Sequence, residues 1–158
     1  MKYADVKVVF REVPEELTLA VNISGCPVKC HGCHSSYLVK DIGEILDRES
    51  LGRLIESNKG ITCVSFMGGD ADPAFIRELS FWVKQTFPGL KTCWYSGRDL
   101  ENARPVLDSL DFVKVGPFID EFGPLDSETT NQRFYRILQT EKGPSLTDWT
   151  FKFRKKLI

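Results

Sequence analysis

Short apolar runs alternate with longer amphipathic segments along the chain. The apolar runs at residues 17–23, 61–66, 90–95 and 111–115 predict buried β-strands. Weaker runs at residues 6–10 and 134–138 predict an early edge strand and one further strand. Gly and Pro follow several of these runs, which favours a turn or loop at the end of each strand.

The strongest helix signal follows the second of these runs. Asp72 is a good N-cap, and Pro73 occupies the first helical position, where its missing N–H is harmless. The apolar stripe behind it has helical spacing and consists of Phe75, Ile76, Leu79, Trp82 and Val83. Ser50 is expected to cap a shorter helix upstream. Asp99 opens a third helical stretch, which Pro105 is expected to break.

Alternating strands and helices predict an α/β fold with parallel strands and right-handed crossovers. In such folds ligands bind at the carboxyl ends of the strands. The segments that follow the four best strands are a cysteine-rich loop, Gly68-Gly69-Asp70, Ser96-Gly97 and Gly116-Pro117. We therefore expect these four segments to meet at one edge of the sheet and to form a site there.

Net charge and the distribution of charged residues limit which partners and which cellular compartment are expected. A formal net charge of −1 gives no reason to expect nucleic acid or an anionic membrane as a partner. Charged residues among the first sixteen leave no room for a secretory apolar segment, and no stretch approaches the ~18 apolar residues that a membrane span needs. The chain of 158 residues is expected to be one cytoplasmic domain, residues 1–158.

The chain has five cysteines, and three of them lie between residues 26 and 33. An odd number in a reducing compartment argues against disulfides and for thiols that bind metal, react or pack. Cys63 and Cys93 lie inside apolar runs, so we expect them to be buried core residues.

Cys26, Cys30 and Cys33 form a C-x3-C-x2-C pattern whose sulfurs can converge on one metal centre. A closed iron–sulfur cluster takes four cysteines, and no fourth is near, so one iron would be left without a protein thiolate. Spacing alone leaves two alternatives open. One is a zinc site completed by His31 or His34, and the other is a set of redox-active thiols.

A C-x3-C-x2-C loop after the first strand resembles the signature of radical S-adenosylmethionine enzymes. Gly68-Gly69-Asp70 resembles that family's GGE/GGD segment, and Trp94-Tyr95-Ser96-Gly97 resembles its W-x-T/S-G segment. The resemblance implies a 4Fe-4S cluster whose open iron is chelated by S-adenosylmethionine. It also implies that reduction of the cluster leads to cleavage of the sulfonium C–S bond.

The same resemblance implies the residues of the site. Cys26, Cys30 and Cys33 would ligate the cluster. The residues next to bound S-adenosylmethionine would be Gly32, Cys33, His34, Gly68, Gly69, Asp70, Ser96 and Gly97. The resemblance assigns no side chain as a general acid or base.

Length suggests the kind of radical enzyme. A full (β/α)8 barrel takes about 250 residues, so this chain is expected to form a partial barrel of five to six mostly parallel strands. Such a site would be open on one side, which favours a macromolecular substrate. Among small family members the chain resembles anaerobic ribonucleoside-triphosphate reductase-activating proteins, with Gly116-Pro117-Phe118 and Thr130-Asn131-Gln132-Arg133 as further shared segments.

That resemblance implies a glycyl radical formed on the large subunit of the anaerobic reductase, with a one-electron donor such as flavodoxin. The alternatives are an activase of another glycyl-radical enzyme, a small-molecule radical enzyme, or a non-enzymatic zinc-binding adaptor. Residues 140–158 are a candidate docking segment for the partner. Within them, aromatic residues alternate with basic ones from Trp149 to Arg154, which predicts an edge strand with a solvated basic end.

Overall fold

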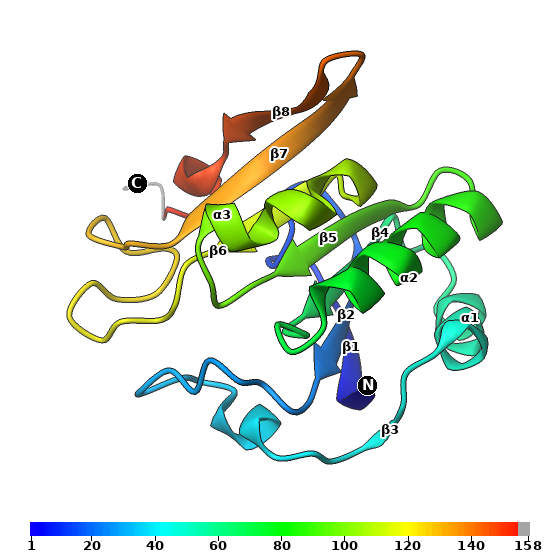
Figure 1. The fold of residues 1–158 in the computed structure, drawn as a ribbon, viewed down its shortest axis with the longest axis horizontal. Coiled ribbons are helices and arrows are strands. Elements are labelled where there is room, and N and C mark those ends of the chain that lie inside the picture. Colours follow the sequence, from blue (N-terminus) through cyan, green and yellow to red (C-terminus); the bar gives the residue numbers. More distant parts are fainter. Residues whose placement is uncertain (155–158) are drawn as a thin grey trace.

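The computed structural model describes residues 1–154 (Figure 1). Eight strands form one mixed sheet: β1 (Lys2–Val9), β2 (Thr18–Ile23), β3 (Glu44–Ile45), β4 (Cys63–Met67), β5 (Lys91–Tyr95), β6 (Phe112–Val115), β7 (Arg133–Thr140) and β8 (Gly143–Asp148). The α-helices are α1 (Arg48–Ser57), α2 (Pro73–Thr86) and α3 (Leu100–Ala103). Three 3-10 helices are also present: η1 (Ser36–Val39), η2 (Arg104–Ser109) and η3 (Thr150–Phe153).

The strand order across the sheet is β3-β1-β2-β4-β5-β6-β7-β8. The central strands β2, β4, β5 and β6 are parallel, and their connections carry the helices. The flanking strands β1, β3, β7 and β8 pair antiparallel. The expected α/β architecture with a parallel centre is therefore present. The sheet has more strands than the five to six expected, and its closure into a partial barrel stays a prediction.

The helix signals are mostly confirmed. Asp72 caps α2 by accepting a hydrogen bond from the Phe75 amide, and Pro73 begins the helix. Asp99 caps α3, which gives way to a 3-10 helix at the position of Pro105.

The prediction for α1 was wrong in one respect, because its N-cap is Asp47 and not Ser50. Ser50 is the third helical residue. Its hydroxyl hydrogen-bonds the Asp47 amide, while the Asp47 carboxylate accepts from the Ser50 amide. The two side chains together form a capping box, in which each side chain accepts a hydrogen bond from the backbone amide of the other residue.

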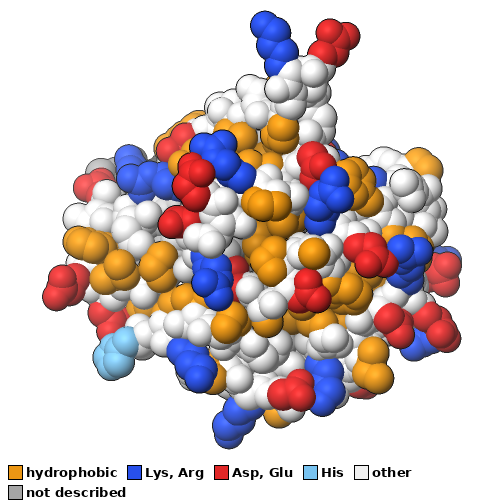
Figure 2. Space-filling view, in the orientation of Figure 1, with side chains coloured by type: hydrophobic (Ala, Val, Ile, Leu, Met, Phe, Trp, Pro, Cys, Tyr) orange, Lys and Arg blue, Asp and Glu red, His pale blue; other side chains and the backbone are white. Residues whose placement is uncertain are grey.

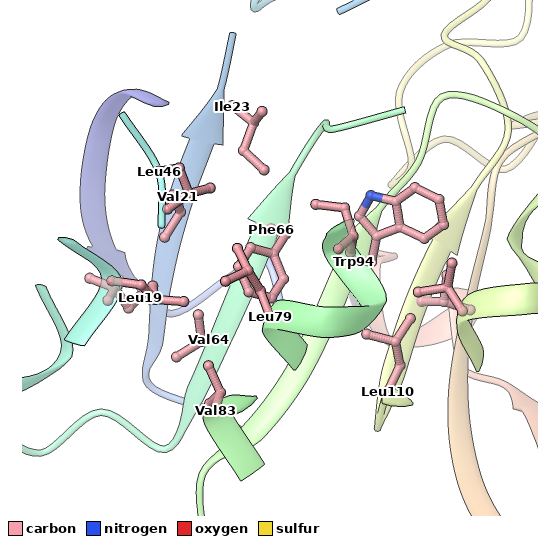
Figure 3. Close-up of a cluster of buried hydrophobic side chains, with 14 of the residues drawn as sticks. Leu19, Val21, Ile23, Leu46, Val64, Phe66, Leu79, Val83, Trp94 and Leu110 are labelled. Atoms are coloured by element: carbon pink, nitrogen blue, oxygen red, sulfur yellow. The ribbon is translucent and has the colours of Figure 1, made fainter. Parts of the chain in front are cut away.

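The helices cover one face of the sheet, and the main core lies beneath them (Figure 3). It contains Val21, Val64, Phe66 and Trp94 from the parallel strands and Leu79 from α2. Hydrophobic residues at i, i+3 and i+4 of α2 reach this face, as the apolar stripe in the sequence predicted. Figure 2 shows Lys/Arg and Asp/Glu side chains interspersed over the outer surface on the α2 and α3 side.

A second, smaller core lies on the opposite face of the sheet. Cys63, Cys93 and Phe112 from the parallel strands pack there with Phe134 from β7. Both cysteines are fully buried, as predicted. Burial raises the pKa of both thiols, because a thiolate loses its hydration there. These two cysteines are therefore inert packing groups.

The chain after β8 is not the predicted edge strand. Residues Thr150–Phe153 form η3, which turns the chain back across the second core. The Phe153 ring lies 4.9 Å from the Phe134 ring, and the Trp149 ring lies 5.9 Å from Phe112. Alternation failed as a signal here because a 3-10 turn also separates the aromatic side chains: Trp149 and Phe153 pack against the second core, whereas Phe151 is 58% exposed. The basic end at Lys155-Lys156 lies outside the described residues.

None of the helices in residues 1–154 is long and apolar enough to cross a membrane.

Candidate metal centre

The cysteine loop leaves β2 at its carboxyl end. Three of its residues adopt the left-handed backbone conformation: Gly25 at φ 76°, Lys29 at φ 52° and Gly32 at φ 73°. The Cys26 amide donates to the Leu38 carbonyl at 2.9 Å, which ties the loop to η1. Cys26, Cys30 and Cys33 are free thiols of intermediate exposure. These reversals of the backbone let one short segment present three thiols.

The loop rests on the segment that follows β5. A Cβ added at Gly97 would lie 3.0 Å from Val28 Cγ2, closer than ordinary van der Waals contact. Val28 stands midway between Cys26 and Cys30. Gly97 is therefore a glycine because the cysteine loop approaches its backbone directly.

The loop also rests on the turn that follows β6. The His34 ring lies 5.8 Å from the Phe118 ring, and His31 Nδ1 lies 3.0 Å from Asp120 Oδ2. A Cβ at Gly32 would lie within 2.4 Å of the Asp120 carboxylate. In Figure 1 the cysteine loop and the yellow segment between β6 and β7 extend from the same side of the sheet. The predicted convergence of these loops is therefore present.

Asp70 joins the segment after β4 to the segment after β5. Its carboxylate accepts hydrogen bonds from the Ser96 hydroxyl and, at 3.0 Å, from the Gly97 amide. Asp70 is only 4% exposed. A buried carboxylate with two donors is well satisfied and fixes the position of both donors. In this structure Asp70 thus positions the very segment against which the cysteine loop packs.

Gly68 and Gly69 have positive φ values of 98° and 89°, which non-glycine residues rarely adopt. The Trp94 indole N–H donates to the Gly68 carbonyl at 2.7 Å. A Cβ at Gly69 would lie 2.6 Å from Ile76 Cδ1 of α2. Both glycines are therefore required by the turn and by packing, whether or not a ligand also lies against them.

A cavity of about 1080 Å³ opens beside the cysteine loop. It is lined by Cys33, His34 and Ser35, by the strand-end residues Met67, Tyr95 and Lys114, by Gln132, by residues of the segments around 10–15 and 124–126, by Phe118, and by residues 151–154. Pockets for small ligands are usually of 300–1,000 Å³, so this cavity has room for one.

Sequence reasoning missed Lys114, which lies inside an apolar run but points into this cavity. Burial lowers the pKa of Lys114 to about 8, and the negative charges of Cys30, Asp70 and Cys33 act in the opposite direction. Tyr95 was noted only as part of a motif. Burial raises the pKa of its hydroxyl well above the usual value, and this hydroxyl donates to the Glu12 carbonyl.

Two kinds of metal site can be weighed against this arrangement. Among residues 1–154, no three His, Cys, Asp or Glu side chains lie together as a single-ion site. His31, a candidate zinc ligand, hydrogen-bonds Asp120 and its side chain is 98% exposed. Three free thiols on one loop are the donors that an iron–sulfur cluster takes, with a separate thiolate on each ligated iron. The donor set therefore fits a cluster with one iron left open.

A comparison with protein families agrees with that donor set. The model of a family described as the 4Fe-4S single cluster domain matches residues 16–138, most of the chain and all five of its cysteines. The chain belongs to this family. No curated protein and no solved structure matches the chain.

Membership of the single-cluster 4Fe-4S family bears on the three kinds of site that the cysteine spacing left open: an iron–sulfur cluster, a zinc site and a set of redox-active thiols. It supports an iron–sulfur cluster as the cofactor and so disfavours a zinc adaptor or a set of redox thiols. The matched range begins just before β2 and ends within β7. It therefore includes the four parallel strands and the segments that follow each of them.

Proposed function

We propose that this single-cluster protein is a radical S-adenosylmethionine activase, which generates a glycyl radical on a protein substrate. The observation that carries the proposal is the mutual contact of three segments: the cysteine loop, Gly68-Gly69-Asp70 and Ser96-Gly97. Asp70 bonds Ser96 and Gly97, and Gly97 packs on Val28 of the cysteine loop. Segments far apart in the chain are thus assembled beside one another, and the cavity opens next to them at Cys33, Met67 and Tyr95.

Each residue then has a physical role. Cys26, Cys30 and Cys33 would hold three irons of a 4Fe-4S cluster as thiolates and leave the fourth iron for S-adenosylmethionine. When bound, the cluster and S-adenosylmethionine supply one-electron cleavage of a sulfonium C–S bond. The backbone of Gly68 and Gly69 can approach a ligand closely because neither carries a Cβ.

The remaining contacts of the ligand would come from residues on and beside the cysteine loop. Gly32 and His34 flank Cys33, and Asp70 holds Ser96 and Gly97 in the segment on which this loop packs. Tyr95, Leu125 and Phe153 line the cavity and also pack against the second core, so apolar groups adjoin the cavity there. Water exclusion protects a reactive radical from side reactions.

The rim of the cavity favours a macromolecular substrate. Phe10 is 76% exposed and Phe151 is 58% exposed, and both line the opening. Exposed aromatic side chains at the mouth of a pocket are typical of protein-binding sites. By resemblance we propose the large subunit of an anaerobic ribonucleoside-triphosphate reductase as the substrate, with reduced flavodoxin or a similar one-electron donor.

The test is anaerobic reconstitution with iron and sulfide, followed by electron paramagnetic resonance with and without S-adenosylmethionine. We expect about four irons per chain, the number in a single 4Fe-4S cluster. We also expect a reduced-cluster signal that changes on addition of S-adenosylmethionine, and release of 5′-deoxyadenosine under reduction. Cys33→Ser should abolish the signal, whereas the matched Cys93→Ala, at a buried packing thiol, should retain it.

The partner is tested separately with purified anaerobic reductase and with another glycyl-radical enzyme. A glycyl-radical signal on the reductase alone supports the specific assignment, and a signal on the other enzyme alone moves the activity to a related activase. A cluster whose spectrum ignores S-adenosylmethionine, with no 5′-deoxyadenosine, would refute the radical mechanism.

A further inference from the structure

Lys114 is the one buried cation among residues 1–154, at 9% exposure. It lies in the middle of β6, and its ammonium reaches the cavity that Cys33 also lines. The residue two positions earlier on the same strand, Phe112, belongs to the second core. Successive side chains of a strand alternate between faces, so Lys114 and Phe112 lie on the same face. Phe112 belongs to the apolar core on that face, and Lys114 lines the cavity next to it.

The ammonium of Lys114 is held by neutral groups. It donates to the Gly116 carbonyl at 2.7 Å and to the Ser96 carbonyl at 3.4 Å. No carboxylate of the described residues forms an ion pair with it. A buried charge without a counter-ion is costly, and proteins tolerate it where an opposite charge lies nearby. Cys33 lines the same cavity as Lys114, and Cys30, Asp70 and Cys33 all act to raise the pKa of its ammonium.

We propose that Lys114 is a positioning residue for the cluster, whose positive charge stabilises the reduced state and raises the reduction potential. The proposal rests on the cluster and its cysteine ligands, and not on S-adenosylmethionine cleavage. Reduction adds one negative charge to a centre already surrounded by thiolates. Net charge and burial are among the main determinants of iron–sulfur potentials. A positive charge still attracts an added negative charge over several ångströms when the effective dielectric constant is ~20.

Lys114 has a second effect through its hydrogen bonds. The Ser96 and Gly116 carbonyls belong to the segments that follow β5 and β6, and both segments contact the cysteine loop. One side chain therefore links these two supports and also lines the cavity that Cys33 lines. The experiment has to separate the charge from the hydrogen bonds.

The experiment is a redox titration of the reconstituted protein without S-adenosylmethionine, in which electron paramagnetic resonance measures the reduced fraction. We expect Lys114→Met and Lys114→Gln to lower the ratio of reduced to oxidised cluster at fixed potential about tenfold, or ~59 mV for one electron. Lys114→Arg keeps the charge and should stay within about twofold of wild type. Lys84→Met is the matched control. Lys84 is half-buried on α2 and pairs with Asp111, at the opposite edge of the sheet.

Each outcome decides the proposal. Wild-type potentials in both Lys114→Met and Lys114→Gln overturn it, and so does an equal shift in Lys84→Met. If Lys114→Arg shifts as far as the neutral variants, or alone fails to hold the cluster, the role is packing and not charge. If only the neutral variants lose the cluster while Lys114→Arg keeps it, the charge is required for the centre itself. Failure of the wild-type protein to bind any cluster instead refutes the proposed function.

Discussion

Gly97→Ala is the most direct test of the contact between the cysteine loop and the sheet edge. A methyl group at this position would lie 3.0 Å from Val28 Cγ2 and 3.2 Å from both Val28 Cβ and Cγ1. Carbon atoms normally approach to about 3.5–4.0 Å. Gly97 does not have a positive φ, so alanine introduces no backbone strain. The whole effect of the substitution is therefore steric and falls on the cysteine loop.

The size of the effect follows from how the clash is relieved. Overpacking of one methyl group costs about 1–3 kcal/mol where the neighbours cannot move. For a chain of this size, each kcal/mol lowers Tm by about 2–4 °C. If instead the loop moves by a few tenths of an ångström, stability is kept and the thiols are displaced. The loss then appears as weaker cluster uptake, with about 1.4 kcal/mol for each tenfold change.

The assay combines thermal unfolding of the metal-free protein with iron content after reconstitution at limiting iron and sulfide. We expect Gly97→Ala to lower the Tm of the metal-free protein, the iron content after reconstitution, or both. Val28→Ala in the same chain removes two of the three close contacts and should recover most of the loss. Gly52→Ala in α1 is the control, because its methyl group would have ordinary contact with Trp82 at 3.4 Å. Unchanged Tm and iron content, or no recovery in the double variant, would show that Gly97 does not support the cysteine loop.

Two further predictions concern acidic side chains. Asp70→Asn leaves one of the two buried donors, Ser96 or Gly97, facing an amide N–H₂, and should cost about 1–3 kcal/mol in urea unfolding. Asp72→Asn, the control, should be near neutral since asparagine caps helices as well as aspartate. An equal loss in both variants would contradict the positioning role of Asp70. The Arg77 guanidinium lowers the pKa of Asp108 below its usual range. This pair therefore stabilises the fold above the unfolded pKa, about 3.9, and the contribution disappears as pH falls through the lower folded pKa. Tm measured from pH 6 to 2.5 should fall less steeply in Asp108→Asn than in wild type, and parallel curves would disprove this.

The parallel centre of the sheet could be predicted because each of its strands is a short apolar run that ends at Gly, Pro or the cysteine loop. The same feature predicted that the loops after these strands meet, since the carboxyl ends of neighbouring parallel strands share one edge. Strands β3 and β8 could not be predicted. β3 has only two residues and both are exposed, and β8 contains Gly143 and Pro144 and is exposed along most of its length. Their pairing depends on neighbours and not on their own pattern.

The burial of Lys114 could not be predicted because it depends on contacts distant in sequence. A lysine inside an apolar run is compatible with an exposed face of a strand, and strand alternation alone does not say which face is covered. Here the second face is covered partly by the segment around Val13 and by η3, which begins 36 residues after Lys114. Which part of this face is covered therefore depends in part on the path of the chain after β8.

The face of the sheet that carries the second core has two parts along its strands. One part is the core itself, and the other lines the cavity, to which residues 151–154 also contribute. Cys63, Cys93 and Phe112 pack under aromatic residues at the amino half of β4, β5 and β6. Two or four residues further along the same strands, Met67, Tyr95 and Lys114 line the cavity. The apolar half closes the floor of the cavity, and η3 lies over both halves, because Phe153 packs in the core while Phe151 lines the opening. Phe151 and Phe153 of η3 therefore line the same cavity as Cys33, although they lie more than 100 residues from it in the sequence.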